Sequence, residues 1–223
     1  MKFLAIFLVT FFSLVAAHGQ SGSTEPIDII YSERLYLENP DPATSIQRLA
    51  GKVQIRQGRT LFYCDSCVIN QTTKIFEAFG KVHINDADTV HVYSDYLRYV
   101  GTNKIAYLTR NVKLTDGRAT LTTNELQYDV SRKIGTYLNG GRVVNKKTVL
   151  TSREGVYYTD VKDFYFRHKV RLVDPSYRLE TDSLLYNTQT QVARFIDDTY
   201  IIDSSKRTIR TREGFYDVAN RKA

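Results

Sequence analysis

The sequence is poor in several residue types that would otherwise define its class. Its 223 residues include no tryptophan, one methionine, four prolines and two cysteines. Two cysteines are too few for a disulfide-built fold, so the stability must come from an apolar core. No nucleophile elbow, phosphate-binding loop or metal-binding helix motif occurs, and no helical periodicity follows residue 20. We therefore expect a non-enzymatic all-β chain without cofactor or metal.

The N-terminal segment has the pattern of a signal peptide. Lys2 precedes an apolar run over residues 3–17, and small residues favour cleavage after Ala17 or Gly19. The run is shorter than the roughly 20 residues of a spanning helix, and no later segment is apolar enough to span a membrane. We expect residues 1–19 to be removed and the mature chain to be exported to the periplasm.

The charge balance indicates an anionic partner. The formal net charge is +7, and loss of Lys2 leaves 30 basic against 24 acidic residues, or +6. An exported chain without a nucleic-acid-binding module is a poor candidate for nucleic acid. An anionic glycolipid or polysaccharide fits the compartment better.

A unit of about 30 residues repeats along the chain, with Ala78–Tyr107 as its clearest copy. Three columns keep the same register. The first column is Val53, Val82, Val112, Val143, Val170 and Tyr200. The second is Ile69, Tyr99, Tyr128, Tyr157, Tyr186 and Tyr216. The third is Ile46, Ile75, Ile105, Ile134, Phe164 and Val192. Three columns in step predict stacked β-units that bury their apolar faces against their neighbours.

Each unit reads as three short strands separated by polar turns. Alternation of apolar and polar residues is clear in Val82-His83-Ile84, where the first strand follows Gly80-Lys81. We expect residues 20–26 to be a polar lead-in and residues 27–223 to be one repeat domain whose last repeat is incomplete. The terminal strands should then present unpaired sheet edges, which favour pairing with another chain.

Several residues invite a catalytic or metal-binding interpretation that the repeat disfavours. Cys64 and Cys67 have the spacing of a redox or metal pair but lie within a strand, and we expect a structural thiol pair or a local disulfide. Acids recur at one place in the units, whereas catalysis requires one asymmetric constellation. His83 and His91 have no carboxylate or serine motif around them, so we expect a packing role.

Two recurring sets of residues are candidates for a binding site. The inward apolar set is Val53, Ile55, Val82, Ile84, Leu97, Val112, Leu114, Leu126, Val170, Leu172 and Leu184. If the sheets are open along one side, these residues form a trough of acyl-chain width, and if the sheets close they are core. The basic set is Lys52, Lys81, Arg142 and Lys169, which precede the first column. Like charges stacked across strands repel, so this set indicates interleaved acids or an anionic headgroup.

The order Gly-Lys-Val-x-Ile, Ser-Asp-x-Leu-x-Tyr and Lys-Ile-Ala or Lys-Ile-Gly resembles the OstA-like family of lipopolysaccharide-transport proteins, from about Ile27 to Tyr216. The resemblance implies an open, elongated antiparallel β-jellyroll, V-shaped in section, whose two sheets hold the acyl chains of lipopolysaccharide. It also implies head-to-tail pairing with a second copy or with other jellyroll components between the inner and outer membranes. The alternative is a closed β-solenoid acting as an envelope scaffold or adhesin without a lipid groove.

Overall fold

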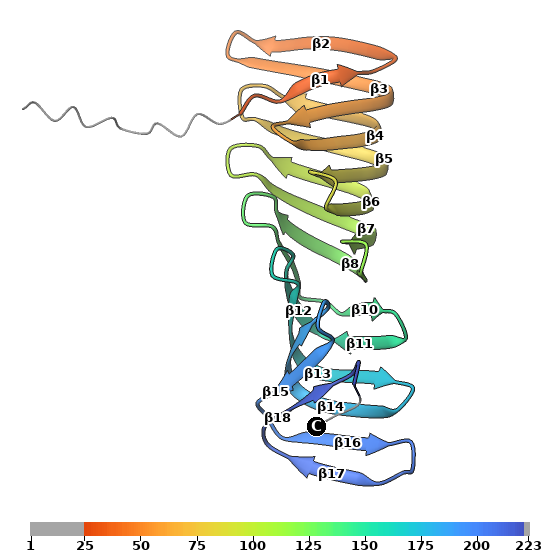
Figure 1. Ribbon diagram of the computed structural model, residues 1–223. Helices are drawn as coiled ribbons and strands as arrows, with labels where there is room; N and C mark the ends of the chain where they lie inside the picture. The colour runs from red at the N-terminus through yellow and green to blue at the C-terminus, as the bar shows by residue number, and fades with distance from the viewer. Residues whose placement is uncertain (1–24, 221–223) are drawn as a thin grey trace, which may run out of the picture.

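The protein is an elongated stack of antiparallel β-strands in the computed structural model, which describes residues 25–220. The expected signal peptide at residues 1–19 lies outside the described residues. Eighteen strands belong to one hydrogen-bonded sheet, and no helix long and apolar enough to cross a membrane occurs in the described part of the chain. Figure 1 shows the chain advancing along the stack from β2 at one end to β17 at the other. The expectation of an all-β, elongated antiparallel architecture is confirmed.

Eight strands are long and bent. They are β3 (Thr44–Gln57), β4 (Thr60–Asn70), β5 (Ile75–Asp86), β6 (Val90–Val100), β7 (Ile105–Thr115), β8 (Ala119–Asp129), β13 (Asp163–Asp174) and β14 (Tyr177–Asn187). The other ten are β1 (Asp28–Tyr31), β2 (Arg34–Asp41), β9 (Ile134–Tyr137), β10 (Gly141–Asn145), β11 (Thr148–Ser152), β12 (Glu154–Tyr158), β15 (Val192–Phe195), β16 (Thr199–Asp203), β17 (Thr208–Thr211) and β18 (Gly214–Asp217).

The bends fold the single sheet into two facing layers. Layer 1 has the pairing order β2-β3-β4-β5-β6-β7-β8-β9-β12-β13-β14-β15-β18. Layer 2 has the order β1-β3-β4-β5-β6-β7-β8-β10-β11-β13-β14-β16-β17. Each long strand contributes one half to each layer, so backbone joins the layers along one edge only. We call that side the bend edge and the opposite side the turn edge.

The Gly-basic-Val sequences lie at the bends rather than at strand starts. The pairing register shifts between Ala50 and Val53 in β3 and between Phe79 and Val82 in β5. Gly80 and Lys81 have φ angles of 72° and 44°, in the left-handed region. Two consecutive left-handed residues form a bulge that turns the strand from layer 1 into layer 2. The third strand of one unit and the first strand of the next are thus a single bent strand.

The core lies between the two layers and runs the length of the stack. Aromatic side chains with less than 2 % exposure fill much of its volume. They are Phe62, Phe76, Tyr99, Tyr128, Tyr137, Tyr157, Phe164, Phe166 and Tyr186. The second predicted column, from Ile69 to Tyr186, therefore lies on the inner face of layer 1 and packs in the core.

Candidate functional site

The structure brings the whole inward apolar set together between the layers. The eleven residues from Val53 to Leu184 belong to one apolar cluster, and each has an exposure of 0 to 3 %. Ile55, Ile84 and Leu114 line layer 2, whereas Leu97, Leu126 and Leu184 line layer 1. The cluster is a continuous apolar interior, and protein side chains cover it.

The interior is less covered at the two ends of the stack. In β2, Leu35 pairs with Leu49, which faces the interior, yet Leu35 is 50 % exposed. In β17, Ile209 pairs with the buried Ile201 and is 54 % exposed. These inward-facing side chains are exposed because no strand of the described chain follows them in the stack. The interior therefore continues to the surface at both ends.

The basic set lies on or beside the bend edge, and the structure divides it into two groups. Lys52 and Lys81 occupy bends of β3 and β5, and the ammonium of Lys52 lies 3.2 Å from the Glu33 carboxylate. Arg142 in β10 and Lys169 in β13 line two adjacent hollows of about 550 and 590 Å³. The four cations therefore do not form one cluster.

Acids alternate with the cations along much of the bend edge. Asn111 donates a hydrogen bond of 2.7 Å to Asp95, and His168 lies 3.2 Å from Asp182. The acids that recur in the repeat thus contact the bends of neighbouring strands. Within residues 25–220, Lys81, Arg142 and Lys169 form no side-chain ion pair, although Asp182 accepts a hydrogen bond from the Lys169 amide and Glu125 accepts one from Asn139. Asn139 and Gly140, which link β9 to β10, line both hollows.

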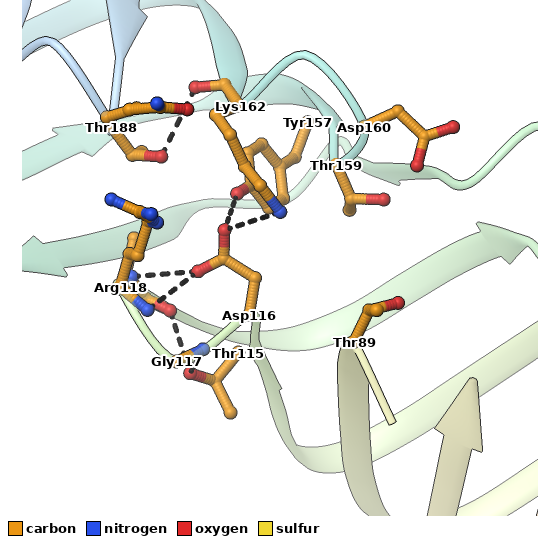
Figure 2. Close-up of polar contacts among 12 residues, drawn as sticks. Thr89, Thr115, Asp116, Gly117, Arg118, Tyr157, Thr159, Asp160, Lys162 and Thr188 are labelled. Atoms are coloured by element: carbon orange, nitrogen blue, oxygen red, sulfur yellow. Dashed lines mark hydrogen bonds and ion pairs between the residues drawn. The ribbon is translucent and has the colours of Figure 1, made fainter. Parts of the chain in front are cut away.

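Tyrosines close the turn edge by hydrogen bonds from one layer to the other. Tyr99 donates to Gln57, and Tyr128 donates to Asp86 at 2.8 Å. Tyr157 donates to Asp116, whose carboxylate also lies 3.2 Å from the Lys162 ammonium. Figure 2 shows Asp116 with Tyr157 and Lys162 on one side and the Arg118 amide on the other. We call these tyrosines and their acceptors the latch.

The latch at Asp116 is an ionised, buried cluster. The Asp116 side chain is fully buried, and burial acts to raise its pKa. Hydrogen bonds from the Ala119 amide, the Tyr157 hydroxyl and the Arg118 amide, together with the Lys162 charge, outweigh burial and lower the pKa below its usual value. Burial and the Asp86 charge raise the pKa of Tyr128, so that hydroxyl remains a donor. The latch therefore holds the layers together at neutral pH.

Sequence reasoning missed the latch, although a signal was present. In the sequence, the tyrosines of the second column serve only to align the repeats, and no hydrogen-bond acceptor is assigned to their hydroxyl groups. The latch acceptors share the period of the repeat with two further polar residues: Gln57, Asp86, Asp116, Asn145 and Asp174 follow one another at steps of 29, 30, 29 and 29 residues. A polar column with the same period as an aromatic one could have indicated a repeated contact.

The two cysteines have no disulfide and lie on the inner face beside the bend edge. Cys64 and Cys67 are both buried, and Cys67 packs between the partner residues Leu49 and Ala78. A hydrogen bond with Cys64, together with burial, raises the pKa of Cys67, which opposes thiolate formation. No group of three or more potential metal ligands occurs among the described residues.

Comparison with known proteins identifies the family. The family model described as "OstA-like protein" matches residues 25–182 and 167–223, which together cover most of the chain. The chain belongs to the OstA-like family. A comparison with curated proteins found no match for this OstA-like chain. Among solved structures it is similar to LptH, described as the LptA homologous periplasmic component of the lipopolysaccharide transport device from Pseudomonas aeruginosa. The identity is 17 %, the TM-score is 0.44, and the match covers 49 % of this chain and 83 % of LptH.

Proposed function

We propose that this OstA-like chain is a non-enzymatic periplasmic carrier that holds the acyl chains of lipopolysaccharide between its two layers and passes them toward the outer membrane. Membership of the OstA-like family supports the proposal. The observation that carries it is the apolar interior, which runs through every repeat while backbone closes it on the bend edge alone. The expected signal peptide would deliver the chain to the periplasm.

Carriage requires binding that is favourable but reversible. Each methylene removed from water contributes about 0.8 kcal/mol, so even a partly inserted acyl chain is held. In our proposal the lipid displaces contacts between the layers, and the latch sets how readily the turn edge parts. Directional movement then requires further grooves in series and an energy source elsewhere. The protein itself has only to open its layers, hold the acyl chain and release it.

The ends of the stack provide the surfaces for such a series. Leu35 and Leu37 at the β2 end are 50 and 66 % exposed, and Ile209 is exposed at the β17 end. Both ends also present outermost strands, which can add a strand from another chain. We propose that a second copy, or another jellyroll component of the transport bridge, pairs with these edges and continues the apolar interior.

The cations of the bend edge have a subsidiary role in this proposal. Arg142 and Lys169 lack ion-pair partners in the described chain and line concave surfaces, so we assign them the contacts with anionic headgroups. Lys52 is already paired with Glu33. We retain Lys52 and Lys81 as weaker contacts, because both lie at bends of the same edge but line neither hollow.

A second function is favoured by the coverage of the interior. The predicted groove residues are 0 to 3 % exposed, and the latch ties the layers together. A closed β-solenoid that serves as an envelope scaffold or adhesin would have both properties permanently. The two functions differ in whether the layers separate to admit lipid.

Lipid uptake distinguishes them. Purified mature protein is mixed with lipopolysaccharide in detergent, separated from free lipid and analysed by native mass spectrometry. The carrier binds lipopolysaccharide, and Leu126→Arg abolishes binding because a charge is placed inside the interior. Gln127→Arg is the matched control, since Gln127 is the next residue and faces solvent. A folded wild-type chain that takes up no lipid would establish the scaffold instead.

A further inference from the structure

Two tyrosines of β14 bury hydroxyl groups that have no hydrogen-bond partner in residues 25–220. Tyr177 is 4 % exposed and Tyr186 is fully buried. In contrast, the hydroxyls of Tyr99, Tyr128 and Tyr157 all donate to latch acceptors. A buried hydroxyl without a partner is unfavourable, so native structures contain few of them. The two β14 hydroxyls therefore mark a place with unused hydrogen-bonding capacity.

Three polar side chains, Asn145, Thr148 and Gln191, lie near the Tyr186 hydroxyl, and each is held by another hydrogen bond. Asn145, which stands where Asp116 and Asp86 stand in earlier repeats, donates to the Thr188 carbonyl at 2.8 Å. Thr148 donates to Asp174 at 3.3 Å, and the Gln191 side chain accepts from Lys146 at 3.1 Å. Tyr128 and Tyr157 each have an aspartate as acceptor. At the corresponding position for Tyr186 the residue is Asn145, whose amide donates to a backbone carbonyl.

The rings of the two tyrosines, as distinct from their hydroxyl groups, pack against apolar and aromatic side chains. Tyr177 packs against Tyr216 with ring centroids 3.8 Å apart. On the inner face of layer 1, Phe164 and Phe166 stack on each other, and their cross-strand partners in β14 are Tyr186 and Leu184, respectively. Two donors at the edge of an apolar space match a ligand that has a polar group attached to a hydrocarbon chain.

We propose that the Tyr177 and Tyr186 hydroxyls form a ligand site for a neutral hydrogen-bond acceptor, the ester or amide carbonyl at which an acyl chain joins its glycolipid headgroup. This inference rests on the proposed function, because it assumes that acyl chains enter the interior. It adds the place along the stack at which the chain is anchored. The residues concerned are outside both sets that the sequence predicted.

Charge explains why the acceptor is neutral rather than a phosphate. Burial raises the pKa of both tyrosines, and for Tyr177 the Asp174 carboxylate adds to the shift, so both groups remain protonated donors. The same carboxylate would repel an anion in this weakly polar surrounding. A carbonyl accepts the two hydrogen bonds without adding charge. Phosphates are better accommodated by the cations of the bend edge.

The test uses two lipids that differ at the carbonyl. Wild-type protein and the Tyr177→Phe/Tyr186→Phe double variant are titrated by native mass spectrometry with 1-monopalmitoylglycerol and with its ether analogue, 1-O-hexadecylglycerol. We expect the wild type to prefer the ester at least about fivefold, since a single neutral hydrogen bond already contributes about that factor. The double variant should lose that preference while binding the ether as the wild type does.

Urea unfolding of the unliganded proteins provides the second readout. Tyr186→Phe should unfold at the same or a higher urea concentration than the wild type, because it removes an unsatisfied hydroxyl. Tyr128→Phe, the matched control, should unfold at a lower concentration because Asp86 loses a donor. Equal binding of the ester and the ether by the wild type would overturn the site while leaving carriage intact. A decrease in urea midpoint for Tyr186→Phe as large as that for Tyr128→Phe would do the same. Binding of neither lipid would overturn carriage and the site with it.

Discussion

The stack consists of two regions that share one interior but differ at both edges. From β2 to β8 the strands are continuous through the bends, and the latch pairs Tyr99 with Gln57 and Tyr128 with Asp86. From β9 to β18 most strands stop at the bend edge, as at Asn139 and Gly140, and only β13 and β14 cross it. The first region is therefore joined more completely on both edges than the second.

The N-terminal segment adds to this difference. The Glu25 carbonyl accepts a hydrogen bond from Gln57 at 2.8 Å, and its carboxylate lies 2.7 Å from the Lys104 ammonium. Residue 25 thus bridges a turn of layer 2 and a turn of layer 1 at the turn edge. In the second region Tyr177 and Tyr186 have unpartnered hydroxyls. The comparison teaches that the repeat specifies the interior, while the edges vary and decide where the layers can part. We expect separation to begin in the second region.

The largest effect is expected at the junction of the two regions. Asp116→Ala removes the acceptor of Tyr157 and the partner of Lys162 and should reduce the free energy of unfolding by about 3 kcal/mol. Urea denaturation measures the change. Asp182→Ala is the control, because the Asp182 side chain is 63 % exposed, and it should cost less than about 0.5 kcal/mol. Equal decreases in the free energy of unfolding for the two variants would show that Asp116 stabilises the fold no more than an exposed acid does.

Acid should open the latch, and the sign follows from the direction of the pKa shift. The folded pKa of Asp116 lies below the unfolded value of 3.8, so the folded state binds this proton more weakly. Its stabilising contribution is complete above about pH 5 and is lost as the pH falls through the folded pKa. Between pH 7 and pH 3 the urea midpoint of the wild type should fall further than that of Asp116→Asn. Parallel curves for the two proteins would contradict this assignment.

A smaller effect tests the continuous bends of the first region. Gly80 has a φ of 72°, and an added Cβ would lie 2.5 Å from the Asp65 carboxylate. Gly80→Ala should reduce the free energy of unfolding by about 1 to 2 kcal/mol, since both strain and contact oppose it. At Gly117, with a φ of 80°, no atom lies within 4 Å, so Gly117→Ala carries the strain alone. A larger loss at Gly117 than at Gly80 would contradict the packing of the bend.

The smallest effect concerns the cations. Arg142→Ala should weaken lipopolysaccharide binding a few-fold at low ionic strength, and added salt should reduce the difference. Lys52→Ala is the matched control, because Lys52 is exposed and already paired with Glu33. A surface pair contributes about 0 to 1 kcal/mol, so stability should hardly change in either variant. Equal weakening by both substitutions would remove the distinction between the two groups of cations.

The fold was largely predictable from the sequence because the three columns keep one register over the whole chain. The bends were not. Inward residues continue at even spacing through the bend, as from Ala78 to Val82, so alternation gives no sign that the strand changes layer there. In β4, which pairs with β5, the inward–outward alternation does shift at the bend, because Cys64 and Cys67 both face inward although they are three residues apart. The spacing of these residues is visible in the sequence, but there it suggests a redox or metal pair and gives no sign of a bend.

The candidate site was predictable in its apolar part and not in its polar part. Leu97 and Leu126 could be assigned to the interior because burial follows from alternation within one strand. The latch depends on side chains about 42 residues apart, such as Tyr128 and Asp86, and on the folding of one layer onto the other. Which hydroxyls lack a partner depends on the exact positions of several side chains. Local patterns contain no information of that kind.

The most direct test of lipid carriage is photo-crosslinking from inside the stack. p-Benzoylphenylalanine replaces Phe62 in the first region or Phe166 in the second, both fully covered between the layers, and irradiation is carried out in the native envelope. Tyr63 and Tyr165, the neighbouring positions on the outer faces, are the controls. Our account predicts lipopolysaccharide adducts from the interior positions and none from the outer ones, with more adduct at Phe166. Adducts from neither interior position in a folded, exported protein would contradict it.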